Sequence, residues 1–254
     1  MTLAGQERRQ QSSGADVAVA ESFLVSDGRV RGLDLHWERF RRGCAAARIT
    51  PSAPPATVVS ALPVSGRWFP RVEVLADGEL RTAVRPAPPR EPEVTAWVCE
   101  SDPRRAPRRK GPDLARLSAL RAQAARHAAG EALLCDDEGR LLEGAYTSLL
   151  WWEDDVLCAP PEEIPALPGT TAGLVLDLAT ARGIPIARCA RRVDELAGRE
   201  IWLLNALHGI RLVTGLAGSA VVPGSGRHFT AWRERVERLR TPLDPLSRSA
   251  GGLR

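Results

Sequence analysis

Apolar and polar residues in the first part of the chain follow patterns that predict strands and one helix. Residues 17–25 have the spacing of a strand, Asp27-Gly28 suits a turn, and residues 33–40 begin a helix with its apolar side chains on one face. Residues 68–84 hold two alternating segments around an Asp-Gly pair, which predicts a β-hairpin. Residues 93–99 supply a further strand.

Strands and helices also alternate in the second part of the chain. We expect helices beginning near Asp113, near Thr170 and near Thr230, and a short helix at 194–197. Strands are expected at residues 131–135, 141–143, 147–152, 156–158, 184–189, 200–204 and 212–216. The charged, proline-rich stretch 100–112 is interpreted as a linker. It divides this α/β chain into a small N-terminal domain with its linker, residues 1–105, and a larger C-terminal domain, residues 106–254.

Composition is typical of a globular protein with a sizeable core, because 44% of the 254 residues are hydrophobic. The polar N-terminus, Met1–Asp16, lacks the apolar segment of a signal peptide, and no apolar run approaches the length of a membrane span. We therefore expect a cytoplasmic protein without a membrane partner.

Charge and cysteine usage exclude two further classes of protein. The net charge is only +4, and the basic run 104–110 has no interleaved aromatic residues, so no nucleic-acid partner is expected. The five cysteines are scattered, odd in number and never in C-x-x-C spacing. They indicate neither a disulfide framework nor a zinc site, and no metal is expected. Each is expected to fill a core position.

Lys110 is the only lysine among 35 basic residues, all the others being arginine. A lysine amine can lose its proton and attack a carbonyl group to form a Schiff base, which a guanidinium group does not do. The alternative is that arginine-rich codon usage left one lysine by chance.

A second candidate site lies at the expected helix start in Leu167-Pro168-Gly169-Thr170-Thr171. Backbone N–H groups at a helix start lack intrahelical partners and sit at the positive end of the helix dipole. Gly169, Thr170 and Thr171 could therefore hold a phosphate group. An ordinary capped helix has the same pattern.

The order of these motifs resembles the fold-type IV, or class IV, pyridoxal-phosphate enzymes over roughly residues 23–213. The residues that carry the resemblance are Asp27-Gly28, His36-x-x-Arg39, Lys110, Asp137-x-Gly139-x-x-x-Glu143-Gly144, Leu167-Pro168-Gly169-x-Thr171 and Asn205-Ala206-Leu207. This family includes branched-chain and D-amino-acid aminotransferases and 4-amino-4-deoxychorismate lyase. It implies a two-domain α/β homodimer, with a small N-terminal and a larger C-terminal α/β domain and pyridoxal 5'-phosphate between them.

The resemblance also implies a role for each matching residue. Lys110 would form the Schiff base with the cofactor and later move protons, while Glu143 would hold the protonated pyridine nitrogen. Arg39 and Thr171, with the backbone N–H groups of Thr170 and Ala206, would bind the cofactor phosphate.

Several residues depart from the family pattern. Ala15-Asp16 through Glu21-Ser22 stands in place of the early Gly-Asp-Gly-x-Phe-Glu/Thr-Thr motif, and the tyrosine that often follows the lysine is absent, the only tyrosine being Tyr146 elsewhere in the chain. Ser148 and Ala172 stand where the family has Asn and Arg. These differences leave open a binding protein that kept the fold and lost the chemistry.

Asn205-Ala206-Leu207 favours the lyase within this family. Aminotransferases commonly use a Thr hydroxyl as a phosphate contact near this point, whereas aminodeoxychorismate lyases resemble Asn-Ala-Leu. Alignment on Asp27-Gly28 also puts Ser22 where the lyases have a Thr hydroxyl near the substrate, and we expect it to donate a proton to departing pyruvate. The expected substrate is thus the small amino compound 4-amino-4-deoxychorismate. The alternative is an aminotransferase for branched-chain or D-amino acids.

Overall fold

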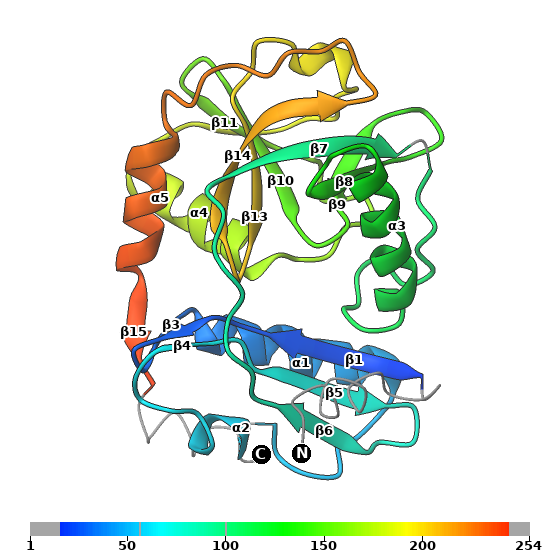
Figure 1. Ribbon diagram of the computed structural model, residues 1–254, viewed down its shortest axis with the longest axis vertical. Helices are drawn as coiled ribbons and strands as arrows, with labels where there is room; N and C mark the ends of the chain where they lie inside the picture. The colour runs from blue at the N-terminus through cyan, green and yellow to red at the C-terminus, as the bar shows by residue number, and fades with distance from the viewer. Residues whose placement is uncertain (1–15, 56, 100, 244–254) are drawn as a thin grey trace, which may run out of the picture.

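The computed structural model describes residues 16–55, 57–99 and 101–243 and divides them into two α/β domains (Figure 1). The expected absence of a signal peptide concerns Met1–Asp16, of which residues 1–15 lie outside the described residues. No helix in the described ranges is long and apolar enough to cross a membrane.

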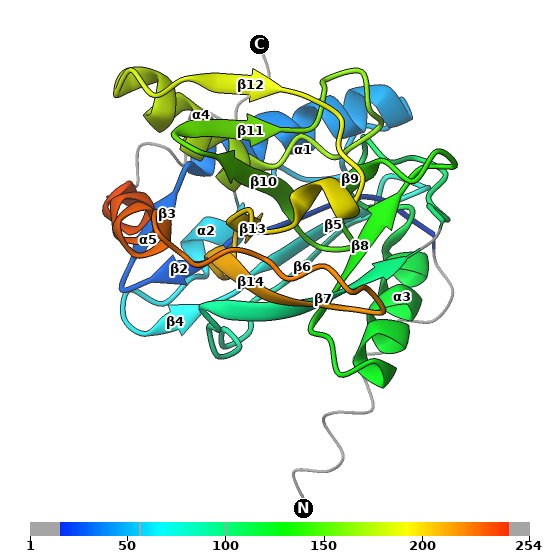
Figure 2. The ribbon, with the colours of Figure 1, turned by 90° about the horizontal axis from the view of Figure 1, so that it is seen from above.

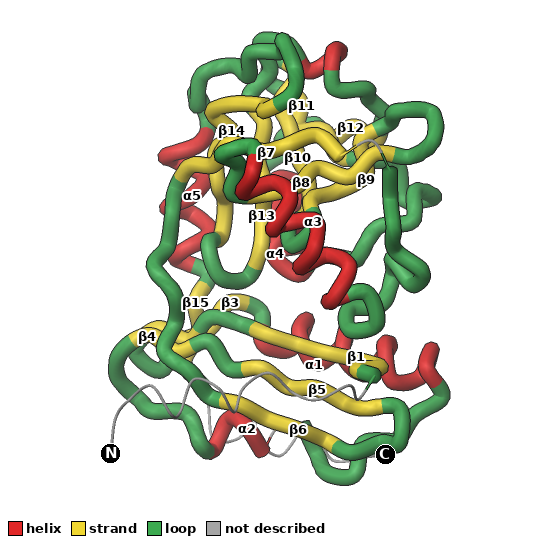
Figure 3. Tube along the Cα trace, turned by 45° about the vertical axis from the view of Figure 1, so that its right-hand side comes forward, coloured by secondary structure: helices red, strands yellow, loops and turns green. Residues whose placement is uncertain are grey.

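The small domain contains a three-stranded sheet that packs on a long helix (Figure 3). The order in this sheet is β1 (Val17–Ser22), β5 (Arg71–Leu75) and β6 (Leu80–Ala83), and the helix is α1 (Leu33–Ala47). A second small sheet has the order β15 (Arg240–Pro242), β3 (Arg29–Arg31), β2 (Val25–Ser26) and β4 (Arg67–Trp68), and α2 (Thr57–Ser60) is a single turn. Phe23, Phe40 and Val72 are buried in their common core, as the apolar periodicity predicts.

The large domain is built on an eight-stranded sheet (Figure 2). Its order is β12 (Ile186–Arg188), β11 (Val156–Ala159), β10 (Ser148–Glu153), β13 (Ile201–Asn205), β14 (Gly209–Ala217), β7 (Glu93–Cys99), β8 (Glu131–Cys135) and β9 (Leu141–Gly144). Three helices and a short 3-10 helix complete it: α3 (Leu114–Arg126), α4 (Thr170–Ala181), α5 (Phe229–Arg238) and η3 (Asp194–Leu196).

Both faces of this sheet are buried, which explains its nearly continuous apolar strands. Helix α4 packs on β10 and β13, α5 packs on β14, and α3 packs on β7 and β8. Trp151 and Trp152 are neighbours in β10 but belong to different core clusters, on opposite faces of the strand.

The structure corrects the position expected for the linker. Strand β7, expected before the linker, pairs in parallel with β14 and β8 in the middle of the large sheet. The chain therefore crosses between the domains at the proline-rich stretch 84–92 and not at 100–112. Proline disfavours both sheet and helix, and the sequence has two such stretches; only the first separates strands that belong to different sheets.

The end of the described chain returns to the small domain. After α5 the chain forms β15, which pairs antiparallel with β3, and the Leu243 N–H donates to the Gly28 carbonyl at 2.8 Å. This strand was absent from the elements expected from the sequence. It is three residues long and has no alternating pattern, because its residues are half-buried or exposed.

Candidate active site

A cavity of about 80 Å³ lies where α1 of the small domain meets the large domain. It contains most of the residues expected from the sequence to act together: Arg39, Lys110, Glu143, Gly169, Thr170, Thr171, Asn205 and Ala206. Ser22 does not line it. The Ser22 side chain is buried beside Glu21, whose Oε1 accepts the Ser22 N–H at 2.8 Å.

Lys110 stands just before α3, where a glycine lets two chain segments approach closely. The Lys110 carbonyl accepts the Ala20 N–H at 2.7 Å. Gly111 has φ 143°, and a Cβ atom there would lie 2.9 Å from the Ala18 carbonyl oxygen, so only glycine fits. Burial lowers the pKa of Lys110 to about 8, an effect that the nearby Glu21 carboxylate partly offsets. The amine therefore loses its proton at a lower pH than an ordinary lysine, which favours its use as a Schiff-base nucleophile.

Asp113 fixes the loop that precedes Lys110. The sequence suggested that this residue caps α3, but its side chain makes no capping hydrogen bond to the helix. Its carboxylate instead accepts the backbone N–H groups of Arg105 at 3.0 Å and Ala106 at 2.8 Å. The loop is therefore held by hydrogen bonds to the buried Asp113 side chain.

Glu143 lies at the cavity wall in β9 and is only 5% exposed. Its Oε1 accepts the Leu167 N–H at 2.8 Å and also contacts Arg104 Nη1. Burial raises the pKa of Glu143 to about 7, and Arg104 limits this rise. The carboxylate can therefore exchange a proton near neutral pH.

Arg104 is a candidate site residue that the sequence analysis missed, because it lies in a stretch interpreted as a solvated linker. Its side chain is 3% exposed and donates to Asp102 Oδ2 at 2.7 Å and to the Pro165 carbonyl at 3.0 Å. Asp102, two residues before Arg104, indicated that this arginine could be paired, but nothing in the sequence placed Glu143 beside Arg104.

A second buried carboxylate, Glu21, binds the expected phosphate ligand Arg39. Arg39 Nε donates to Glu21 Oε2 at 2.9 Å and Nη2 to Oε1 at 2.7 Å, and His36 Nδ1 lies 3.1 Å from Oε1. Burial opposes ionisation of Glu21, but Arg39 and His36 outweigh it and hold its pKa well below the usual range. Sequence analysis assigned Glu21 no role; the signal was a charged residue inside the apolar strand β1.

The helix start of α4 faces the same cavity. Gly169 is the residue before the helix, and neither threonine makes a capping bond, contrary to the cap expected at Thr170 or Thr171. Arg39 Nη1 donates to the Pro168 carbonyl at 3.2 Å, and His36 Nε2 lies 3.3 Å from Thr170 Oγ1. The small-domain cluster thus reaches the first turn of the helix.

Gly169 permits a close approach at this point. A Cβ atom at Gly169 would lie 2.0 Å from Ser148 Oγ and 3.2 Å from Ser148 Cβ, so a larger residue would displace the Ser148 side chain. This packing keeps the free N–H groups of the first helical turn at the cavity wall.

The turn after β13 closes the cavity from the large domain. Asn205 Oδ1 accepts the His208 N–H at 2.8 Å, and the Ala206 carbonyl accepts Arg31 Nη2 at 2.8 Å. The Asn205 side chain therefore stabilises its own turn, so that Ala206 meets the cavity with backbone and a methyl group.

Tyr146 also lines the cavity, although it is remote from Lys110 in the sequence. Its hydroxyl donates to the Leu114 carbonyl at 3.4 Å, and the Arg121 guanidinium lies 5.0 Å from the ring centroid. The fold thus supplies a tyrosine at the cavity from the segment after β9, where the sequence pattern led us to expect none.

These groups match the parts of pyridoxal 5'-phosphate. An amine of lowered pKa suits the aldehyde, a buried carboxylate suits the ring nitrogen, and a helix start beside an arginine suits the phosphate. The donor set fits the cofactor, and Tyr146 and Arg104 add two polar groups to the same wall.

Comparisons with known proteins identify the family and the fold. The family model for amino-transferase class IV matches residues 18–216. A hypothetical aminotransferase from Mycobacterium tuberculosis in its apo form has a TM-score of 0.75 at 24% identity, with 87% of each chain covered. A branched-chain aminotransferase from Thermoproteus uzoniensis has a TM-score of 0.77 at 18% identity, with 90% of each covered.

A third solved structure, a provisionally named 4-amino-4-deoxychorismate lyase from Legionella pneumophila, has a TM-score of 0.75 at 13% identity and covers 91% of this chain and 97% of its own. No curated protein matches the sequence. The fold-type IV architecture and the enzyme class expected from the motif order are confirmed. Because the matching model spans well over half of the sequence, this chain belongs to the class IV aminotransferase family of pyridoxal-phosphate enzymes.

Proposed function

We propose that the protein is a pyridoxal-phosphate-dependent lyase that converts 4-amino-4-deoxychorismate to 4-aminobenzoate and pyruvate. The observation that carries this proposal is the Asn205 turn. Its side chain is bonded to the His208 N–H, so the cavity wall at Ala206 offers backbone and no side-chain hydroxyl. This is the arrangement that the lyase-like Asn-Ala-Leu motif implies.

The cofactor supplies an electron sink when bound, and the residues of this chain supply the rest. Arg39 and the first turn of α4 would bind the cofactor phosphate, while Glu143 would keep the ring nitrogen protonated. Lys110 removes the ring proton from the carbon that bears the amine. The ether C–O bond then breaks, the six-membered ring becomes aromatic, and enolpyruvate takes up a proton to give pyruvate.

We assign the returned proton to Lys110 and not to Ser22, in contrast to the sequence-based expectation. Ser22 does not line the cavity, and its backbone is tied to Glu21. Lys110 has gained a proton in the preceding step and lies at the cavity wall. In this lyase reaction one group, Lys110, can both remove and return the proton. The lyase needs no second substrate, whereas an aminotransferase must also accept a keto acid.

The test is incubation of the purified protein with 4-amino-4-deoxychorismate alone, followed by assays of pyruvate and 4-aminobenzoate. We expect equimolar products without a keto acid, and none with Lys110→Ala. A Ser22→Ala variant should retain most of the activity. Absence of both products from the wild-type protein overturns the lyase proposal.

The second candidate is an aminotransferase, favoured by the neighbour from M. tuberculosis, which has the highest identity of the three structures described. Amino transfer from a branched-chain or D-amino acid to 2-oxoglutarate, in place of pyruvate release, supports it. A protein that binds no cofactor and does neither reaction is a binding protein with this fold. We propose a homodimer in each case, which light scattering of the purified protein tests.

A further inference from the structure

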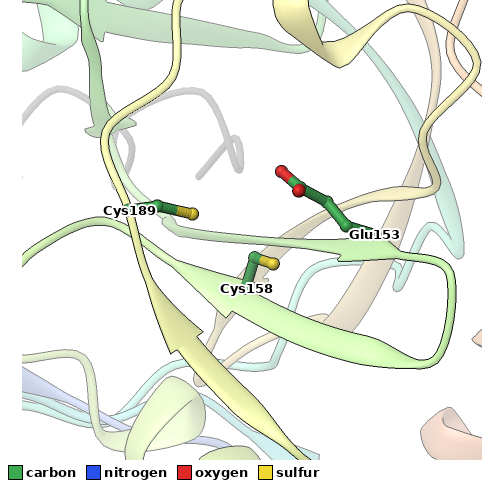
Figure 4. A group of neighbouring side chains, drawn as sticks. All are labelled: Glu153, Cys158 and Cys189. Carbon is green, nitrogen blue, oxygen red and sulfur yellow. The ribbon is translucent and has the colours of Figure 1, made fainter.

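Three side chains far from the catalytic cavity point into one small space (Figure 4). They are Glu153, Cys158 and Cys189, and their donor atoms all lie within 4.8 Å of one another. We infer that they form a binding site for a thiophilic divalent cation such as zinc. The scattered cysteines had suggested neither a zinc site nor any other metal site, because residues 158 and 189 are distant in the sequence.

Backbone pairing holds these side chains on one face of the large sheet. Glu153, the last residue of β10, pairs with Val156 of β11 across a tight turn. Two residues further from the turn on each strand, Trp151 pairs with Cys158. Cys158 also lies beside Ala187 of the parallel strand β12, and the Cys189 N–H donates to the Ala159 carbonyl at 3.0 Å. Side chains two residues apart on a strand lie on the same face of the sheet. Cys189 therefore lies on the same face as Ala187 and its strand partner Cys158.

Neighbouring donors orient the carboxylate toward this space. Trp151 Nε1 and Arg191 Nε both donate to Glu153 Oε1 at 2.9 Å. Within the described part of the chain, Glu153 Oε2 accepts one hydrogen bond, from Arg191 Nη2 at 3.2 Å, so this oxygen keeps a lone pair for an ion. Such outer hydrogen bonds to a ligating group are typical of metal sites.

The charges balance for a divalent ion. Two thiolates and one carboxylate carry three negative charges, a divalent cation leaves one of them in excess, and the Arg191 guanidinium compensates it. On binding, each thiol releases its proton to solvent. Sulfur donors select zinc, cadmium or cobalt over magnesium and calcium. A water molecule completes the four ligands that zinc prefers.

The different burial of the three residues gives an ion access to the site. Cys158 is buried, whereas Cys189 and Glu153 are partly exposed and give an ion a route from solvent.

The site is separate from the catalytic cavity. None of its three residues lines that cavity, which meets β10 at the opposite end, at Ser148. An ion here would tie the β10–β11 hairpin to the segment after β12 and stabilise the edge of the sheet. The inference therefore does not depend on which reaction the enzyme catalyses.

The test is titration of the reduced, chelator-treated full-length protein with cobalt chloride, read as thiolate-to-cobalt charge-transfer absorption. We expect one equivalent of cobalt to bind, zinc to displace it, and the melting temperature to rise with added zinc. Cys189→Ala and Cys158→Ala should abolish the absorption, and Glu153→Gln should weaken cobalt binding by about tenfold or more. Cys44→Ala, which removes a buried cysteine of α1, is the matched control and should bind like the wild type.

Because Cys158 is buried, its variant could fail to fold; the partly exposed Cys189 keeps the test decisive. The inference is overturned if the reduced wild-type protein shows no thiolate-to-cobalt absorption, or if that absorption persists in Cys189→Ala. It is also overturned if the two cysteines oxidise to a disulfide in air and the reduced protein binds no cobalt.

Discussion

Glu21 of the small domain and Glu143 of the large domain are both buried, and both carboxylates interact electrostatically with Lys110. Their pKa values nevertheless shift in opposite directions. Glu21 accepts two bonds from Arg39 and lies beside His36, and its pKa falls well below the usual range. Burial raises the pKa of Glu143 to about 7, because Arg104, which Glu143 shares with Asp102, only partly offsets it.

This difference separates a permanent charge from a titratable one. Glu21 remains ionised across the physiological range and fixes Arg39 at the expected phosphate end of the cavity. Glu143 is close to balance between its two protonation states, which suits a group that shares a proton with a ring nitrogen. Burial opposes ionisation of both carboxylates, so the difference in pKa comes from their neighbours: Arg39 and His36 outweigh burial at Glu21, whereas Arg104 does not outweigh it at Glu143.

Removing Lys110 should have the largest effect on turnover, since this is the amine with which both carboxylates interact. Lys110→Ala should fold and lose at least about 10³-fold in turnover, because it removes the nucleophile and the general base together. Intact-mass analysis after borohydride reduction with pyridoxal phosphate measures this directly, because Lys110 is the sole lysine and the α-amine is the control. A side-chain adduct that persists in the alanine variant contradicts the assignment.

Breaking the permanently charged cluster should have the next largest effect. Glu21→Gln leaves the buried Arg39 and His36 without their anion and should lower the free energy of unfolding by about 3 kcal/mol. Denaturant unfolding measures this loss. The exposed Glu38, which pairs with Arg41 on the same helix, supplies the control Glu38→Gln, expected to be as stable as the wild type. Equal stability of both variants would mean that the Glu21 cluster is not needed for folding.

Removing the titratable carboxylate should have a smaller and different effect. Glu143→Gln should keep the cofactor, because the phosphate contacts remain, and should slow turnover by about 10²-fold by weakening the electron sink. Turnover that stays at the wild-type value removes Glu143 from the reaction.

Glu143 should also contribute to the pH dependence of stability. Its raised pKa means that the folded protein binds more protons than the unfolded chain between pH 4.5 and about 7. This contribution is complete below 4.5 and is lost as the pH rises to about 7. The difference in unfolding free energy between wild type and Glu143→Gln, measured without cofactor, should therefore change by roughly 2–3 kcal/mol across this window.

The smallest expected effect concerns Arg104, whose contact with Glu143 should alter the titration of that carboxylate. Arg104→Gln removes the main charge that favours the ionised carboxylate and should shift the upper end of that pH window upward by about one pH unit. The exposed neighbour Arg105 provides the matched control Arg105→Gln, which removes the same charge from the same loop. Identical profiles for the two variants would show that Arg104 is only a structural residue.

Local sequence patterns predicted individual helices and strands better than the pairing of strands that are distant in the sequence. The Asp-Gly hairpin is confirmed as β5 and β6, and most expected helices and strands are present, because apolar periodicity reflects burial within one element. The pairing of β7 with β14 and of β15 with β3 depends on contacts between distant segments. Neither pairing leaves a local pattern, and this is why the linker was placed incorrectly.

The candidate site divides in the same way. The single lysine and the motif order indicated Lys110, Glu143, Arg39 and the helix start, which all line one cavity. Arg104 and Tyr146 also line this cavity, and Glu21 binds Arg39. These three residues were missed because their partners lie in other elements. Ser22 was suggested by a short alignment, and its place beside Glu21 keeps it off the cavity wall.

Because β15 returns to the small domain and pairs with β3, the small domain is completed only by the end of the described chain. A fragment that ends before Arg240 would leave β3 with an unpaired edge, and open edges of this kind promote pairing between chains. Glu237, at the end of α5, binds Arg31 of β3 and Arg90 of the crossing segment, and truncation would remove that anchor as well. We therefore expect the N-terminal domain expressed alone to aggregate, and to become soluble when a peptide containing residues 229–243 is supplied in trans.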